Sequence, residues 1–392
     1  MNARWTARGV LRASTAKLRV LSAVGVIAWA GTVAATSSDA PMQLGTDGSL
    51  GSLFLQMTSA DARALGRPEL DVRWSLANNW SIPTTLVRGG QTVLLQTDEQ
   101  ADSIVASIRA PWSRLLGPGP SFGARPLWER LSTTFEARVI EHWGGWSDGT
   151  VEWWHHLIGC FNFDRSLYPR DAVNVTLMDT GTGRGIGIHS SRFAVGDLVA
   201  RTQFLVAEGG VSKTTPGRSR WGVSTRLDVK VPVGSPSRLG GSGGWDGGLA
   251  LLGTAELTRW LTVHGMAAVS AFSPLALPEP LQPRTWHYTA ELSMAFRAGP
   301  VTLLFEDRLD STLFQAGWQR VPLGGNDGFL SSGYFGAFRP QNQLSGGVRF
   351  GPVTFWFSED WTPGSNPYSS SGWFYNSNTP DIEIGLAYSR SL

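Results

Sequence analysis

Hydrophobic and polar residues alternate with a period of two over most of the chain. From Trp221 to Val231, large or β-branched side chains at odd positions alternate with Gly222, Ser224, Arg226, Asp228 and Lys230. Successive side chains of a β-strand point to opposite faces, so this pattern predicts a strand with one apolar and one polar face. The same pattern predicts strands over residues 69–76, 198–207, 249–257, 261–272, 286–297, 301–309, 344–350, 353–357 and 382–388.

The lengths of these segments favour a membrane barrel over a soluble sandwich. They run for about 9 to 12 residues, and short turns alternate with long loops rich in Gly, Ser and Pro. Transmembrane β-barrels have strands of about 10 residues, with an apolar outer face and a polar inner face. Strands of β-sandwiches average nearer 5 to 6 residues. We therefore predict an all-β fold, a transmembrane antiparallel barrel of about 12 strands, within 10–14; residues 84–130 are too weakly patterned to assign.

The first residues resemble an export signal. Residues 1–20 carry five basic side chains and no acid, and residues 21–35 form an apolar run that ends in Val33-Ala34-Ala35. A basic start, a short apolar core and small residues at the end are typical of a cleaved signal peptide. An N-terminal membrane anchor is the alternative, but the run is shorter than the roughly 20 residues of a spanning helix. We expect a signal peptide at 1–35, a flexible periplasmic segment at 36–68 and the barrel at 69–392.

The C-terminal residues fit the last strand of an outer-membrane barrel. Ile382, Ile384, Leu386 and Tyr388 alternate with polar or small residues up to the terminal Leu392. The pattern resembles the terminal strand signal read by the barrel assembly machinery, although that signal prefers a terminal aromatic residue. We expect an outer-membrane location, with membrane lipids and this machinery as partners, and the oligomeric state is left open.

One segment breaks the period of two. Val151, Trp154, His155 and Ile158 are spaced as on one face of a helix, which predicts a short helix near residues 148–159. Asp148 is placed to cap its start, and Glu152 lies in the first turn, where the helix dipole favours an anion. With Trp153 and Trp154 adjacent, we expect this helix to lie at a membrane interface or to fold over the barrel mouth.

This segment also carries a family resemblance. The residues concerned are Gly144-Gly145-x-x-Asp148, Val151-Glu152, His155, Arg165, Tyr168-Pro169-Arg170 and Gly196-Asp197. They resemble an uncharacterised, domain-of-unknown-function family of bacterial predicted outer-membrane barrels. The resemblance extends from about Glu69 to the C-terminal strand, and it implies fold and location but no activity.

Composition agrees with this interpretation once the signal is removed. Only 16% of the residues are charged while 42% are hydrophobic, and a charge content below the typical 25% counts against an ordinary cytosolic enzyme. The single Cys160 excludes an internal disulfide. The formal charge of +2 becomes −3 without residues 1–35, with 28 Lys and Arg against 31 Asp and Glu, so we expect no nucleic-acid partner.

Candidate catalytic chemistry is sparse. Glu152 and His155 could bind a metal only with a third ligand that the sequence does not identify. The run Gly240-Gly-Ser242-Gly-Gly244 matches G-x-S-x-G, but it lacks the strand–turn–helix context of a nucleophile elbow. A lipid hydrolase would need His142 beside a Ser and an acid on one outer face. We therefore assign no catalytic residue, no metal site and no cofactor.

The polar faces of the strands would line the lumen. The expected lumen-lining charges are Arg201, Arg226, Asp228, Lys230, Glu291, Arg297, Glu306, Arg308 and Arg349. They are compatible with a narrow channel for small solutes, whose selectivity such residues would tune, and also with a closed, salt-bridged interior. A barrel of this size can be filled by side chains or leave a narrow pore, so both functions stay open.

Overall fold

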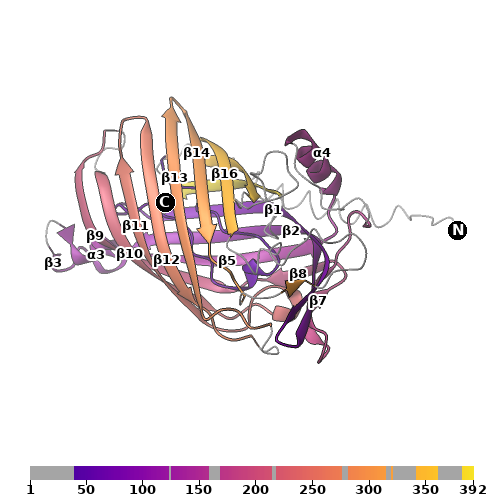
Figure 1. Cartoon of the computed structure of the whole chain (residues 1–392). Coiled ribbons are helices and arrows are strands. Elements are labelled where there is room, and N and C mark those ends of the chain that lie inside the picture. The colour runs from indigo at the N-terminus through magenta and orange to yellow at the C-terminus, as the bar shows by residue number, and fades with distance from the viewer. Residues whose placement is uncertain are drawn as a thin grey trace.

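Twelve long antiparallel strands form one closed barrel in the computed structural model (Figure 1). The structure describes residues 39–122, 125–158, 168–213, 218–275, 281–314, 319–320, 341–360 and 382–392. The barrel strands are β1 (Glu69–Arg88), β2 (Gln91–Pro111), β5 (Leu131–Trp143), β9 (Leu198–Val211), β10 (Ser219–Val231), β11 (Asp246–Glu256), β12 (Leu261–Ala271), β13 (Trp286–Ala298), β14 (Val301–Asp310), β16 (Gln341–Phe350), β17 (Val353–Asp360) and β18 (Ile382–Ser391).

The barrel closes because β1 pairs on both sides. Its register runs from Glu69↔Ser391 to Asn78↔Ile382 against β18, and β1 also pairs along its length with β2. Closure leaves no open strand edge. The backbone N–H and C=O groups of such an edge would have no hydrogen-bond partners in the hydrocarbon of a membrane. The predicted fold class and strand number are therefore confirmed. Of the strands that the sequence did not assign, β2 lies in the weakly patterned region 84–130 and β5 follows it.

The two rims of the barrel differ in their connections. One rim carries tight turns, with Gly299 and Gly351 at positive φ, together with the start of β1 and the end of β18. We call it the short-turn rim; it also carries α2 (Ser113–Leu116), β3 (Ser121–Phe122), β4 (Arg125–Pro126) and α3 (Leu127–Arg130). The opposite, long-loop rim carries α4 (Asp148–Ile158) and β6 to β8, and Figure 1 shows these two groups at opposite ends of the barrel.

The long-loop rim extends into a cap. Strands β6 (Val175–Asp179) and β7 (Arg184–Ile188) form a hairpin, and β6 pairs with the part of β2 that runs beyond the barrel. β8 (Arg192–Val195) pairs with β5, β15 (Gln319–Arg320) with the end of β1, and the short turn η3 is Pro236–Arg238. The cap is therefore hydrogen-bonded to extensions of the barrel strands.

The outer face of the wall suits lipid. Large apolar side chains remain exposed in a band around it: Leu227, Leu249, Leu251, Leu292, Leu303, Phe305, Leu309, Leu344, Val348 and Phe355. Exposed aromatic residues flank the band, with Trp221, Trp260 and Phe350 toward the short-turn rim and Trp245, Trp286 and Tyr288 toward the long-loop rim. A lipid-facing band between two aromatic girdles is typical of transmembrane barrels. None of the helices in the described ranges has the length and hydropathy that a membrane-crossing helix needs.

The N-terminal segment lies inside the lumen. Residues 39–66, which we call the plug, are largely buried and contain one turn of 3₁₀ helix, η1 (Gly51–Leu53). We expected residues 36–68 to be a flexible periplasmic segment, and for the described part of it that expectation is wrong. Its backbone polar groups find partners on the charged inner wall, which a segment in water would not need.

Candidate functional site: the lumen and its plug

The plug enters and leaves the lumen at the short-turn rim. The Asp39 carbonyl accepts a hydrogen bond from His264, close to the start of β12. At the apex, Lys230 near the long-loop end of β10 donates to the Leu53 carbonyl. The chain then returns, and the Ala62 N–H donates to Thr254 near the end of β11. The plug is therefore a doubled-back loop with both ends at one rim.

The two arms of this loop are tied to each other. Arg63 forms an ion pair with Asp39 across the base at 3.0 Å. Near the apex, the Thr46 N–H donates to Gln56 Oε1 at 2.7 Å, and Gln56 Nε2 donates back to the Thr46 carbonyl at 2.5 Å. The plug therefore has an internal framework of its own.

Small residues of the wall make room for the plug. A Cβ at Gly222 would lie 3.0 Å from Arg63 Cα, and one at Gly248 would lie 2.5 Å from Met57 Sδ. On the opposite side, a Cβ at Gly347 would lie 2.6 Å from Met42 Sδ. Interiors of small barrels are usually filled by wall side chains. Here the wall leaves a space that a chain segment occupies.

Polar contacts hold the arms of the plug to the wall. Within the described residues, cationic wall side chains donate to plug carbonyls as follows: Arg73 to Gln43, Arg201 to Gln56, Lys230 to Leu53, Arg308 to Leu44 and Met57, and Arg349 to Ala40. Wall carboxylates accept from plug N–H groups: Glu306 from Met42 and Leu44, Asp246 from Leu55, and Glu291 from Ser59. The wall thus supplies the partners that a β-ladder would otherwise provide.

The nine charges expected to line the lumen all lie on the inner side of the wall. Asp228 accepts from both Arg201 and Arg226 at 2.6 and 2.7 Å, and Arg297 lies 3.8 Å from Asp39 of the plug. Some of these charges therefore form salt bridges within the wall, and others bind the plug. Sequence reasoning missed Arg73 and Asp246, which serve the plug in the same way.

The base of the plug carries a buried charge cluster. Asp61 contacts Arg63 at 2.6 Å and Arg218 at 2.9 Å. Burial disfavours the charged carboxylate, but the guanidinium groups of Arg218 and Arg63 outweigh that effect and hold the pKa of Asp61 well below its usual range. Asp61 is therefore ionised wherever the plug is seated.

The apex of the plug packs into an apolar cluster beneath the cap. Its apolar side chains are Leu50, Leu53, Phe54, Leu55 and Met57. They meet buried residues of the extended strands and cap, among them Leu86, Leu95, Leu177, Ile188, Phe272 and Phe314. Phe54 and Phe272 lie 4.8 Å apart between ring centroids. The plug therefore occupies the lumen, and its apex also packs against the cap at the long-loop rim.

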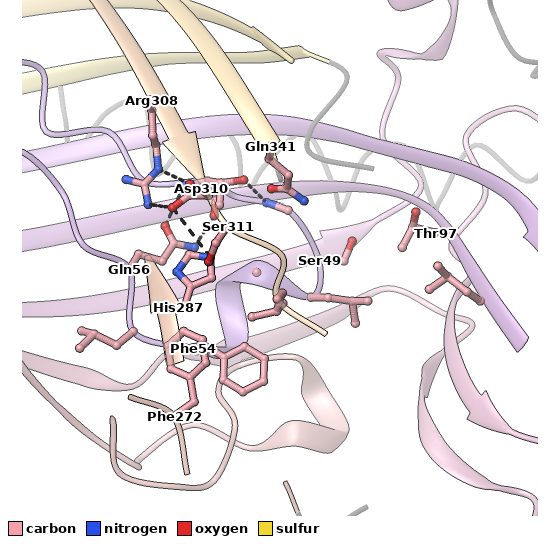
Figure 2. A pocket seen from close by; sticks show the side chains of 17 residues that line it. Ser49, Phe54, Gln56, Thr97, Phe272, His287, Arg308, Asp310, Ser311 and Gln341 are labelled. Atoms are coloured by element: carbon pink, nitrogen blue, oxygen red, sulfur yellow. Dashed lines mark hydrogen bonds and ion pairs between the residues drawn. The ribbon is translucent and has the colours of Figure 1, made fainter. Parts of the chain in front are cut away.

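Two small cavities lie beside the plug in the described part of the chain. One, of about 50 Å³, lies near the apex, and Figure 2 shows Arg308, Asp310 and His287 on one side of it and the Phe54–Phe272 pair on another. A second, of about 70 Å³, lies between the plug and Arg138, Arg201 and Glu383. Spaces of this size hold a few water molecules.

No catalytic arrangement is present at the residues considered earlier. His142 points into the lumen, where its Nδ1 lies 2.9 Å from Glu99 Oε2, and Ser49 of the plug donates to the other oxygen of Glu99 at 2.6 Å. The second ring nitrogen of His142 has no hydrogen-bond partner among the described residues. In a catalytic triad the nucleophilic Ser contacts the His ring, whereas Ser49 contacts the carboxylate of Glu99. Ser242 is buried and accepts from Lys230, so it is not exposed on an elbow.

The predicted helix forms, and its polar side chains tie it to the barrel wall and to the segment that follows it. Asp148 accepts from Asn78 Nδ2 at 3.0 Å and from the Asp171 N–H at 2.7 Å. Glu152 pairs with Arg170, and His155 Nε2 lies 3.6 Å from Glu359. Trp154 also bonds Glu359, while Trp153 is exposed. Within the described ranges, no three His, Cys, Asp or Glu side chains converge to hold a metal ion.

Among known proteins, similarity is found with solved structures. No family model matches the chain, and no curated protein matches it. It is similar to an outer-membrane channel from Pseudomonas putida F1, with 11% identity, a TM-score of 0.41, and 85% of this chain and 98% of that one covered. The NanC porin has 8% identity and a TM-score of 0.37, with 82% of this chain and 98% of that one covered. The CymD monoaromatic hydrocarbon channel has 11% identity and a TM-score of 0.28, with 91% of this chain and 95% of that one covered. At these values the likeness concerns the fold alone.

Proposed function

We propose that this protein is an outer-membrane channel for small polar solutes whose pore is closed by its own residues 39–66. The observation that carries the proposal is the polar fit between plug and wall. Gly222, Gly248 and Gly347 leave space for a doubled chain, and charged wall groups bind that chain through its backbone. Without the plug, the same groups would be solvated, and the lumen would be a water-filled pore.

The proposal includes export by a signal peptide cut near residue 35. Cleavage there would leave the mature terminus a few residues before Asp39, and Asp39 itself lies at the short-turn rim. The wall contributes both Arg201 and Lys230 and both Glu291 and Glu306, so we expect weak discrimination between anions and cations.

Urea offers a direct test of plug release. The arms of the plug depend on hydrogen bonds and ion pairs in a wet lumen, whereas the barrel ladder is sealed in lipid. We expect moderate urea to induce reversible conductance in planar bilayers, while a heat-modifiable gel shift still reports a folded barrel.

A disulfide between plug and wall sharpens this test. Met57→Cys with Gly248→Cys places two thiols where a Gly248 Cβ would lie 2.5 Å from Met57 Sδ, and Cys160→Ser removes the native thiol. We expect the oxidised protein to stay closed in urea and to conduct after reduction. Equal conductance in both states would show a pathway independent of the plug; none in either state would show a permanent filling.

The charge cluster at the base predicts the pH dependence of release. The pKa of Asp61 is lower in the seated plug than its ordinary value of 3.8, so its ion pairs stabilise the plug above that value and fade only as the pH falls below it. The contribution of Asp61 to plug stability should therefore be the same at about pH 7 and about pH 5. Asp61→Asn should lower the stability of the seated plug, measured from the urea midpoint, by about 3 kcal/mol at both pH values. A difference between the unmodified protein and Asp61→Asn that shrinks from pH 7 to pH 5 would contradict this account.

A further inference from the structure

Helix α4 packs on the outside of the barrel rather than over its mouth. The ring of Trp154 lies 5.1 Å from that of Phe357, and its Nε1 donates to Glu359 at 2.9 Å. Phe357 and Glu359 share the outward face of β17 with Phe355, which is exposed to lipid. Figure 1 shows α4 to one side of the strands at the long-loop end.

The residues around α4 cover the neighbouring strands as well. Asn78, on the outward face of β1, donates to Ser147 Oγ at 2.8 Å, and the rings of Trp80 and Tyr168 lie 6.0 Å apart. We call residues 144–158 and 168–171 the collar. Outward-facing residues at this end of β1 and β18 are buried, namely Leu76, Trp80 and Ile382. The collar therefore covers the outer surface of β1 and β18 at this rim.

The uncovered face of α4 is largely apolar, with His156 its one exposed titratable side chain, and the exposed charges of the collar, Arg170 and Asp171, lie outside the helix. Trp146, Trp153 and Leu157 are each more than half exposed, at 53%, 61% and 61%. Within α4, the exposed positions carry no Lys, Arg, Asp or Glu, because Asp148 is buried and Glu152 is partly covered and paired with Arg170. A helix face in water is normally charged, whereas exposed Trp and Leu on an uncharged face are typical of a membrane interface.

We propose that the collar binds outer-leaflet lipid, with Trp146, Trp153 and Leu157 inserted at the boundary between headgroups and acyl chains. Continuity supports this occupant, because Trp245, Trp286 and Tyr288 form the aromatic girdle at the same rim on other strands. Trp residues favour that boundary, since the ring is apolar and its N–H is polar. The collar continues the girdle across β17, β18 and β1, where the wall is covered.

Depth-dependent quenching tests the proposal. In a Cys160→Ser background, Leu157→Cys is labelled with a fluorophore, and the full chain is reconstituted into phosphatidylcholine vesicles that contain spin-labelled lipid. Phe355→Cys, on the lipid-facing wall, is the positive control, and Thr182→Cys, exposed in the β6–β7 turn of the cap, is the matched control in water. Each variant is first checked by the heat-modifiable gel shift.

We expect quenching at position 157 to exceed that at position 182 several-fold and to be stronger with a headgroup spin label than with one deep in the acyl chain. Iodide in the water should show the opposite order, quenching position 182 more than 157. Equal lipid quenching at 157 and 182 would overturn the proposal. A second outcome would also overturn the proposal: position 157 is not quenched by lipid and is protected from iodide only at high protein density. That result would show that a second copy of the chain, and not lipid, covers this face.

Discussion

Deletion of residues 39–66 is expected to turn a closed barrel into a conducting pore. The plug occupies the space between Gly222, Gly248 and Gly347. Once the plug is removed, Arg308, Lys230 and Glu306 lose plug partners and bind water instead, so the lumen stays wet. Planar bilayer recordings should show stable conductance steps that the full chain lacks.

Two controls keep this deletion interpretable. The heat-modifiable gel shift must show that the shortened chain forms a barrel. A second variant keeps the full length but replaces the apolar apex residues Leu53, Phe54 and Leu55 by Ser, which should release the plug from the cap cluster and give frequent openings. A folded deletion variant without any conductance would refute the channel.

Replacement of Arg308 by methionine is expected to produce the largest effect of any single change. Arg308 Nη1 donates to Leu44 at 3.1 Å and to Met57 at 2.6 Å, so one side chain joins both arms of the plug to the wall. Its loss would also leave Asp310 without its 2.6 Å ion pair. The two hydrogen bonds to the plug come from a charged donor and are each worth about 1.5 kcal/mol or more, so their loss should disfavour the closed state by about 3 kcal/mol. The ratio of open to closed time should rise roughly a hundredfold.

The chain provides a matched control at Arg226. Like Arg308, it is 3% exposed and pairs with the aspartate two residues later on its own strand. Its recorded hydrogen bonds go to Asp228 and not to the plug. Arg226→Met should therefore lower barrel stability without raising open time. Single-channel recording distinguishes the two, and similar openings in both variants would show that general loosening, not the clamp, opens the pore.

The sequence identified most of the barrel because strands facing lipid on one side and a polar lumen on the other show a strict alternation. β10 is the clearest case, with exposed Leu227 between buried Arg226 and Asp228. Strand β2 was missed because only part of it faces lipid. The residues before Ala101 extend into the cap, where Asp98, Glu99 and Gln100 are all buried.

The plug could not be predicted by periodicity, because it is neither helix nor strand. Its hydrogen bonds reach partners far along the chain, such as the bond between Leu44 and Glu306 over 262 residues. A partial signal does exist in the inner faces of the strands. Gly222, Gly248 and Gly347 occupy inward positions where a self-filled barrel would carry larger side chains.

The motif that suggested a family resemblance has a structural explanation in the collar. A Cβ at Gly144 would lie 1.8 Å from the Asp171 carbonyl oxygen, and Gly145 has a φ of +74°. Asp148 and Glu152 tie the helix to Asn78 and Arg170. Arg165 lies outside the described residues. The sequence located this unit, but only the register of β1 and β17 shows that it faces outward.

Because both arms of residues 39–66 return to the same rim, the segment forms a slip loop rather than a thread. It can be withdrawn or reinserted without passing a free chain end through the ring of strands, and folds without true threading are the rule. Pairing of β1 with β18 therefore need not wait for the segment to be in place. During biogenesis the barrel can therefore close first, and the plug can enter the lumen afterwards.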